Sequence, residues 1–399
     1  MRYNQLSNER ILSIDAFRGI TILVMIFVNE LAGVHDIPQW MKHMPRDADA
    51  MSFVDVVFPG FLFIVGMSIP FAITRRLAKG DSFWQLQSHI IWRVVGLLLL
   101  GVFMVNGEGG YNESAMGMSI AAWSLLFYLC AILVWNVYTF KNKKWKYLLQ
   151  GVGAIGLLWL AWIYRGGDDG SEGIKPRWWG ILGLIGWSYL YGCIIYQLFR
   201  GKVWPLLFAI AACVAWYCTA RSGFSKGSIV LEWMSSTAGH AAHTSIVLCG
   251  IVLSILFFDE RIAATLQRRF VYSTLFALAC FVAGFLIRPY YFISKIHATP
   301  TWCLYCSAIC IALFSILYWF TDIKKRYKWT AFFQPAASNA LLVYILPNII
   351  YYTQALFGWH FMPAIFHRGL SGIAWSALYA VVIMLLAFGL NKLKVRLQL

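Results

Sequence analysis

Residues 55–77 read DVVFPGFLFIVGMSIPFAITRRL, and this stretch decides the fold. No charged side chain lies between Asp55 and Arg75. A hydrocarbon core about 30 Å thick takes roughly 20 helical residues to cross, so the stretch predicts a transmembrane helix. A helix is required because lipid cannot pair with free backbone N–H and C=O groups. The charged residues at both ends mark where this helix leaves the apolar layer.

Runs of the same kind recur along the chain, which is 60% hydrophobic and 13% charged, with a mean hydropathy of +0.66. This composition is typical of membrane proteins. The twelve runs are 11–32, 55–77, 88–106, 118–138, 145–164, 178–199, 203–220, 243–258, 270–288, 299–320, 336–357 and 371–391. The runs at 203–220 and 243–258 are short. We therefore predict an all-α, polytopic bundle of about 12 spans (10–12), forming one transmembrane domain over residues 1–399 without a separate soluble domain.

The net charge of +16 would suggest nucleic-acid binding in a soluble protein, but here the cations gather in alternate loops. The clusters are Arg75, Arg76 and Lys79; Lys141, Lys143, Lys144 and Lys146; Arg261, Arg268 and Arg269; and Lys324, Lys325, Arg326 and Lys328. Because basic loops face the cytoplasm, both termini are predicted to be cytoplasmic. The partner of these clusters is then the lipid bilayer and not nucleic acid. A cytoplasmic ligand that carries phosphate is a second interpretation of some of them.

The ends and the cysteines add little chemistry. Residues 1–10 are polar and the first apolar run is full length, so no cleavable signal peptide is expected. The nine cysteines lie almost entirely in apolar runs, and the CxxC at Cys303 and Cys306 has no acidic or histidine company. We interpret them as packing residues and expect no metal site.

The histidines concentrate on one side of the predicted topology. Seven of the eight lie at or near the external face: His35, His43, His240, His243, His297, His360 and His367. Imidazole exchanges protons near neutral pH, so this distribution suits proton-transfer chemistry on the outer side. Any one of these histidines is equally explained by the tolerance of the membrane interface for histidine.

Ionisable residues inside membrane spans are costly and point to function. Asp15 and Arg18 are three apart in the first span and can pair on one helical face. Asn29 lies near the external end of that span. Asp55 begins the second span, where the helix dipole favours a carboxylate. A structural ion pair and an N-terminal helix charge explain the same residues without any catalysis.

Three segments carry a resemblance to a known family. They are RILSIDAFRGITILVMIFVN (10–29), the Lys42–His43 pair followed by VDVVFPGFLFIVGMSIP (54–70), and KWTAFFQPAASNALLVYI (328–345). Together they resemble the heparan-α-glucosaminide N-acetyltransferases and their bacterial relatives. In that family a loop supplies a catalytic histidine, and the next helix begins D-x-V-F-P. We expect neither the luminal domain nor the leading helix of the animal enzymes, so the sequence resembles the shorter bacterial members. That resemblance implies a multi-pass protein of the inner cell membrane.

The resemblance implies a reaction. An acetyl group would pass from cytoplasmic acetyl-CoA, as co-substrate, to the amine of a terminal glucosamine-like sugar or glycan on the external side. Such an amine must lose a proton to attack a thioester, so a base is needed. The base would be His43, which acts directly or as an acetyl carrier. The segment between His43 and Asp55 is slightly longer than in the family's pattern, and His35 is the alternative.

The remaining roles follow from the same resemblance. Asp55 would orient the imidazole, and an amide from Asn29 or Asn339 would stabilise the oxyanion. Further residues predicted to bind the donor are Asp15, Arg18, Arg75, Arg76 and Asn339, and those predicted to bind the acceptor are Arg288, His297 and Trp40. Arginines at the cytoplasmic mouth suit the phosphates of the donor.

Two other functions stay open. A twelve-span secondary transporter would also carry ionisable residues in its spans, although we find no internal repeat between the two halves. A membrane O-acyltransferase acting on a glycan hydroxyl would use the same histidine and aspartate. Oligomeric state is also left open, with a homodimer as one option.

Overall fold

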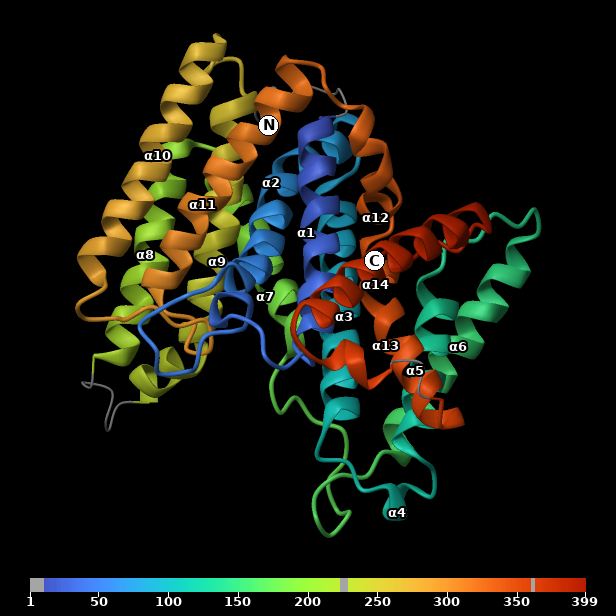
Figure 1. The fold of residues 1–399 in the computed structure, drawn as a ribbon. Coiled ribbons are helices and arrows are strands. Elements are labelled where there is room, and N and C mark those ends of the chain that lie inside the picture. The colour runs from blue at the N-terminus through green and yellow to red at the C-terminus, as the bar shows by residue number, and fades with distance from the viewer. Residues whose placement is uncertain (1–10, 223–228, 360–362) are drawn as a thin grey trace. The chain divides into compact units, whose positions relative to one another are not determined.

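The computed structural model describes residues 11–222, 229–359 and 363–399, and over these residues the chain is helical (Figure 1). The longer helices are α1 (Leu12–Leu31), α2 (Val57–Ala78), α3 (Phe83–Glu108), α5 (Ile120–Trp135), α6 (Lys143–Ile163), α7 (Gly180–Leu198), α8 (Val203–Arg221), α9 (Ile229–Phe258), α10 (Leu266–Ile287), α11 (Pro300–Tyr318), α13 (Ala340–Phe357) and α14 (Gly369–Lys392). The short elements are η1 (Gln39–Met41), η2 (Phe53–Val56), α4 (Glu113–Met116), η3 (Trp319–Ile323), η4 (Lys328–Phe333), α12 (Gln334–Ser338) and η5 (Ala364–His367). The all-α prediction is confirmed.

Eleven helices of the described residues are long and apolar enough to cross a membrane. They coincide with eleven of the twelve predicted runs, and α5 coincides with the twelfth, at 118–138. With 16 residues, α5 is the shorter apolar helix. The chain is therefore a multi-pass membrane protein with a number of spans inside the predicted range.

A contact between two loops bears on whether α5 crosses as well. The side chains of His43 and Lys295 touch, as expected of two residues on the same side of the membrane. Seven of the eleven long helices lie between them, and an even number of crossings would need one more. A crossing by the sixteen-residue helix α5 would supply it and would give the twelve spans that the sequence predicts. At 1.5 Å per residue α5 is about 24 Å long, a mismatch that local thinning of the bilayer can accommodate. The cytoplasmic location of both termini stays a prediction.

The boundary of α9 differs from the prediction. The apolar run predicts a span over 243–258, whereas the helix begins at Ile229, and the window within Glu232–Phe258 is 94% buried. Small polar residues precede the apolar run and lower its hydropathy, but their hydroxyls are satisfied inside the helix. Thr237 Oγ1, for example, donates to Trp233 O over 3.0 Å. His240 and His243 therefore lie within a membrane-length helix, while His360 falls outside the described residues.

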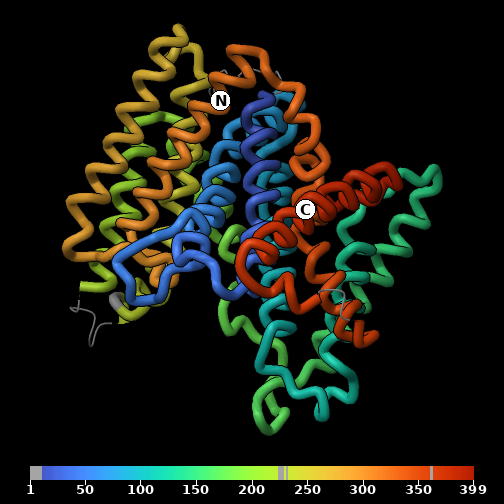
Figure 2. Tube along the Cα trace, in the orientation of Figure 1, coloured from blue at the N-terminus to red at the C-terminus, as the bar shows by residue number. Residues whose placement is uncertain are grey.

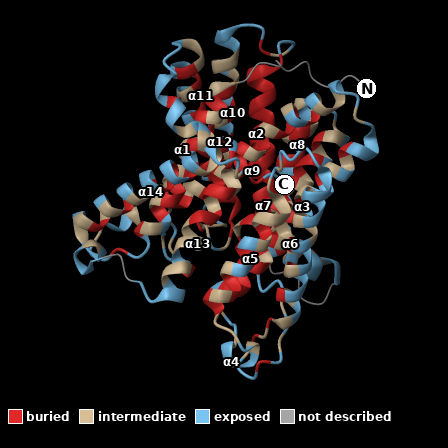
Figure 3. Ribbon diagram, turned by 90° about the vertical axis from the view of Figure 1, so that its right-hand side faces the viewer, coloured by how far each residue is buried: buried red, intermediate tan, exposed pale blue. Residues whose placement is uncertain are grey.

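The contacts divide the chain into two compact units. Unit 1 contains the described residues up to Thr21 together with Pro38–Val94 and Ile185–Ala331. In this unit α9 packs against α2 and α8, and α10 packs against α11. The buried faces of α2 and α9 are seen in Figure 3.

Glycines bring α2 and α9 into backbone contact. A Cβ added at Gly66 would lie 2.0 Å from the carbonyl oxygen of Val247, and one at Gly250 would lie 2.1 Å from that of Phe63. Small residues permit such close approach between membrane helices. The seam fixes α2, whose N-terminal end follows Asp55.

Unit 2 contains Ile22–Ile37, Val95–Leu184 and Phe332–Leu399. Here α5 packs against α6 and α13, and α13 packs against α14. Phe103, Trp123 and Phe127 form a stacked aromatic core with ring centroids 4.9–6.2 Å apart. The single-domain interpretation of the sequence stays a prediction.

Candidate active site

The loop between α1 and α2 is held beside the segment that leads into α11, as the blue and orange tubes show in Figure 2. Asp49 makes the main connection, because its carboxylate accepts hydrogen bonds from Arg288 Nε over 3.0 Å and from Ile293 N over 2.8 Å. Ser294 Oγ donates to Arg46 O over 2.8 Å. These contacts place two segments far apart in sequence against each other within unit 1.

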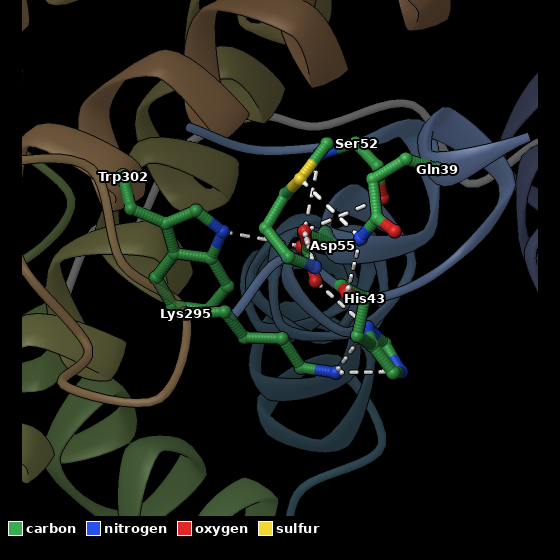
Figure 4. A network of polar contacts seen from close by, with 7 residues as sticks. Gln39, His43, Ser52, Asp55, Lys295 and Trp302 are labelled. Atoms are coloured by element: carbon green, nitrogen blue, oxygen red, sulfur yellow. Dashed lines mark hydrogen bonds and ion pairs between the residues drawn. The ribbon is translucent and has the colours of Figure 1, made fainter. Parts of the chain in front are cut away.

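Asp55 is the buried anchor of the loop, with a side chain only 2% exposed (Figure 4). Its Oδ2 accepts hydrogen bonds from Ser52 N over 3.0 Å, from Ser52 Oγ over 3.3 Å and from Met44 N over 3.3 Å. Ser52 is the N-cap of η2, and the Asp55 carboxylate accepts from its backbone N–H, a donor that the helix start leaves free. The position of Asp55 is therefore set by main-chain contacts from two directions.

His43 forms a hydrogen bond with the other oxygen of the Asp55 carboxylate. Its Nδ1 lies 2.7 Å from Asp55 Oδ1, and 42% of its side chain is exposed. A carboxylate can only accept, so Nδ1 carries the proton and Nε2 is the acceptor in the neutral ring. This is the arrangement in which a histidine acts as a general base.

Lys295 completes the cluster. Its Nζ lies 3.1 Å from both Nδ1 and Nε2 of His43. A point equidistant from both nitrogens within the ring plane would overlap the ring atom Cε1, so the ammonium lies against the ring face and leaves the Nε2 lone pair accessible. Burial lowers the pKa of the Lys295 ammonium below its ordinary value, and the carboxylate of Asp55 opposes this shift.

The backbone around Lys295 is fixed by a tight turn. Thr299 N donates to Ser294 O over 3.1 Å, and Ser294 N donates to Thr299 Oγ1 over 3.0 Å. Ala298 adopts a φ of +50°, an uncommon value for a residue with a side chain. Trp302, in the first turn of α11, donates from Nε1 to Asp55 O over 3.2 Å. The loop carrying Lys295 is thus tied to the main chain of the carboxylate that holds His43.

The predicted acceptor-side residues lie around this cluster. Arg288 is in the ion pair with Asp49, and Trp40 is 60% exposed with its ring 5.8 Å from Phe53. His297 Nε2 accepts from Arg46 Nε over 3.2 Å, while an oxygen of Asp47 lies 3.5 Å from the same nitrogen. One nitrogen cannot accept and donate at once. We assign the Arg46 bond, because it is shorter and the Asp47 side chain is 87% exposed.

The predicted donor-side residues of unit 1 lie along α1 and α2. Arg18 NH1 is 3.4 Å from Asp15 Oδ1, and its NH2 donates to Ser68 Oγ over 2.9 Å. Arg76 pairs with Asp81 over 2.6 Å, and Arg75 is exposed. Ser68 follows Asp55 by thirteen residues, which corresponds to about 20 Å of helix rise. Arg75 and Arg76 therefore lie at the end of α2 opposite the histidine cluster, and Arg18 contacts the middle of that helix.

Three predicted residues belong to unit 2. Asn29 is exposed and lines a cavity there. Asn339 is buried, and its Nδ2 donates to Asn391 Oδ1 over 2.8 Å and to Val395 O over 2.9 Å. Both amide protons that an oxyanion would need are therefore engaged in holding the C-terminal segment. The main chain of His35 pairs with residues 367–369, whereas the Asp55 carboxylate pairs with His43.

The sequence places the chain in a family. The family described as a domain of unknown function, DUF5009, matches residues 10–254. The chain belongs to the DUF5009 family. This match includes the whole His43–Asp55 loop and ends within α9.

Two characterised proteins resemble part of this DUF5009 member. Human heparan-alpha-glucosaminide N-acetyltransferase is 37% identical over 97 residues, which is 24% of this chain and 14% of the human protein. The mouse protein of the same name is 36% identical over 100 residues, 25% of this chain and 14% of its own length. The chain thus matches about a seventh of the length of these relatives.

Sequence reasoning did not assign Lys295, Ser52 or Trp302 to the cluster. The sequence places Lys295 near Arg288 and His297 in the loop before α11, but nothing in the spacing indicates that this loop meets residues 40–55. Ser52 stands three residues before Asp55, which is the spacing of a capping box and was a usable signal. Trp302 is indistinguishable in sequence from the many other membrane tryptophans.

Proposed function

We propose that this protein is a membrane acetyltransferase that moves an acetyl group from cytoplasmic acetyl-CoA to the amine of a glucosamine-like sugar on the external side. The proposal is carried by one observation: a buried carboxylate, Asp55, holds Nδ1 of the half-exposed His43 and leaves Nε2 accessible. Membership of the DUF5009 family and the local identity to two N-acetyltransferases support it.

His43 would act as the base. Nε2 takes a proton from the attacking amine as its nitrogen forms a bond to the thioester carbonyl carbon. The C–S bond then breaks, and the thiolate leaves with a proton from the imidazolium. Asp55 stabilises the positive charge that develops on the ring, because its carboxylate already lies 2.7 Å from Nδ1. In the alternative route, Nε2 attacks the thioester first and the amine displaces the acetyl group from the ring.

Lys295 would contribute positive charge to the transition state. The tetrahedral intermediate carries an oxyanion, and a preorganised cation in a partly buried site stabilises such a charge more than it would in water. The Nζ atom is 3.1 Å from the reacting nitrogen of His43, so a group attached there lies within its field.

The donor would be bound by the arginines of α1 and α2. Coenzyme A carries several phosphates, and guanidinium groups bind phosphate in a bidentate manner. Arg75 is exposed, whereas Arg18 forms an ion pair with Asp15 and Arg76 forms one with Asp81. The long pantetheine arm of the donor suits a reaction centre near the opposite end of α2. A hydroxyl acceptor would use the same histidine and aspartate.

The test is transfer of label from labelled acetyl-CoA to a panel of amino sugars by the purified protein in detergent. Wild-type protein should produce N-acetylated sugar, and His43→Ala should lose about 10²- to 10⁴-fold in rate while still binding the donor. His35→Ala is the matched control. Full activity of His43→Ala together with loss of activity in His35→Ala would transfer the role to His35, and full activity in both would remove the chemical basis of the proposal.

The direction of the reaction has a separate test. We expect both termini and the loop at 139–146 to be cytoplasmic and the loop at 40–54 to be external. Single cysteines in these loops, labelled in intact and in permeabilised cells, distinguish the two sides. Labelling within 40–54 only after permeabilisation would reverse the proposed direction.

A further inference from the structure

Unit 2 contains a cavity of ≈ 980 Å³ that none of the proposed chemistry uses. Helices α1, α3, α7, α13 and α14 all contribute to its lining, and every lining residue belongs to unit 2. Its volume is at the upper end of the range of about 300–1,000 Å³ typical of small-molecule sites. The question is which class of ligand its side chains would select.

Two carboxylates face this cavity. Glu30 lies in the last turn of α1, and Glu108 is the last residue of α3. Among the lining residues, all of which lie in the described part of the chain, none is a lysine or arginine, and His367 is the remaining ionisable side chain apart from tyrosines. In a chain with a net charge of +16, this is an acidic cavity.

Both carboxylates lie at the C-terminal ends of helices, where a negative charge is less favourable. The C-terminus of a helix carries a partial negative charge, so a carboxylate there is destabilising unless a cation is present. Trp375 Nε1 donates to Glu30 Oε1 over 2.8 Å, which orients that carboxylate without neutralising it. No described side chain forms a hydrogen bond or ion pair with Glu108. Neither carboxylate has a cationic partner among the described side chains, and a bound cation would supply one.

The walls indicate an organic cation with a ring. Trp178, Tyr351 and Trp375 line the cavity together with the amide of Asn348. Aromatic faces attract cations and pack against the C–H face of a saccharide ring. An amide offers both a donor and an acceptor for hydroxyl groups. A bare metal ion would use neither the aromatic surface nor a volume of this size.

We propose that this cavity binds the amino sugar in its protonated form and distinguishes it by charge from its N-acetylated product. The ammonium makes charge-assisted hydrogen bonds to Glu30 and Glu108, whereas the product amide is neutral and cannot. Loss of one charge-assisted contact weakens binding by about ten- to hundred-fold. The cavity would thus bind the amine in preference to the amide. The choice of an amino sugar rests on the proposed function, but the preference for a cation does not.

The experiment is calorimetric titration of the full-length protein in detergent with glucosamine, N-acetylglucosamine and glucose at pH 7. Glucosamine should bind about ten- to hundred-fold more tightly than the two neutral sugars. Glu108→Gln should abolish this preference, and Glu108→Asp should retain part of it. Glu260→Gln is the matched control, because Glu260 is an exposed carboxylate in unit 1 and the charge change is the same. Thermal unfolding of each variant shows whether it is folded.

The outcomes separate this inference from the proposed function. His43→Ala should bind glucosamine with wild-type affinity, whatever its turnover. If no acetyl transfer is found but the charge preference and its dependence on Glu108 are present, the cavity is a site for amines and the proposed reaction is wrong. Equal binding of the three sugars, or a preference unchanged in folded Glu108→Gln, would overturn the inference even if acetyl transfer is observed.

Discussion

Replacing Asp55 by asparagine tests the centre of the proposed mechanism with a nearly isosteric side chain. The carboxylate accepts from His43 Nδ1, from the backbone N–H groups of Ser52 and Met44, and from the Ser52 hydroxyl. An amide has one accepting oxygen and one donating nitrogen, so it cannot replace both carboxylate oxygens. The amide nitrogen must therefore face either His43 or the two backbone N–H groups of Ser52 and Met44.

The magnitudes decide between the two orientations. If the amide nitrogen faced Ser52 and Met44, two buried N–H groups would lose their acceptor, at a cost of about 1–3 kcal/mol each. If it faces His43, the imidazole only needs to change tautomer so that Nδ1 accepts. The second orientation therefore wins, and it moves the ring proton to Nε2, the atom that should act as the base. The same tautomer error in a serine protease triad lowers turnover by about 10⁴-fold.

We therefore expect Asp55→Asn to fold with a nearly unchanged thermal midpoint and to lose about 10³- to 10⁴-fold in kcat. The assay is the transfer of labelled acetyl groups at saturating donor, with thermal unfolding in parallel. Asp47→Asn removes the same charge from an exposed site in the same loop and should keep wild-type turnover. Activity of Asp55→Asn within about ten-fold of wild type would refute the tautomer argument, because a base blocked by its own proton cannot work at that rate.

Three further substitutions probe the neighbourhood of the site. Lys295→Met should lower kcat. Because burial lowers the pKa of this lysine in the folded chain, the substitution should also raise the thermal midpoint at pH 7. This gain in thermal midpoint should vanish as pH rises through the folded pKa towards 10.5, and a gain that persists there would contradict the prediction. Arg18→Ala should weaken acetyl-CoA binding by about ten- to hundred-fold in a titration without acceptor. A lower thermal midpoint with unchanged affinity would show that Arg18 has a structural role, through its contacts with Asp15 and Ser68. Arg288→Gln should release Asp49 and raise the proteolytic sensitivity of the loop at 40–54, and an unchanged cleavage rate would show that the ion pair does not hold it.

The fold was largely readable from the sequence because hydropathy alone locates membrane helices. The predicted start of the helix at Ile229–Phe258 is wrong, because small hydroxyl residues lower the hydropathy of a segment that still forms a helix. Their hydroxyl groups donate to backbone carbonyls of the same helix, as Thr237 does. The status of Ile120–Trp135 could not be settled from its length. The contact between His43 and Lys295 favours a crossing there, because it would make the number of crossings between these two residues even.

The site was readable only where its members are close in the chain. His43 and Asp55 are twelve residues apart, and the start of α2 after a polar loop predicts both. Lys295 lies 252 residues from His43, so no local pattern connects them. The cavity of unit 2 depends on five long helices at once, and its two glutamates are ordinary helix-end residues until the walls around them are known.

The glycine seam between α2 and α9 has a consequence for inherited variation. A single-base change converts a glycine codon to an alanine codon, and at Gly66 or Gly250 the new methyl group would collide with a carbonyl oxygen of the facing helix. The helices would have to separate, carrying with them the start of α2 and the aspartate before it. Mutations that abolish function are thus expected at positions in the middle of the membrane that touch no substrate. Damaging substitutions in this family are therefore expected at glycines of this seam, far from the histidine whose position they would disturb.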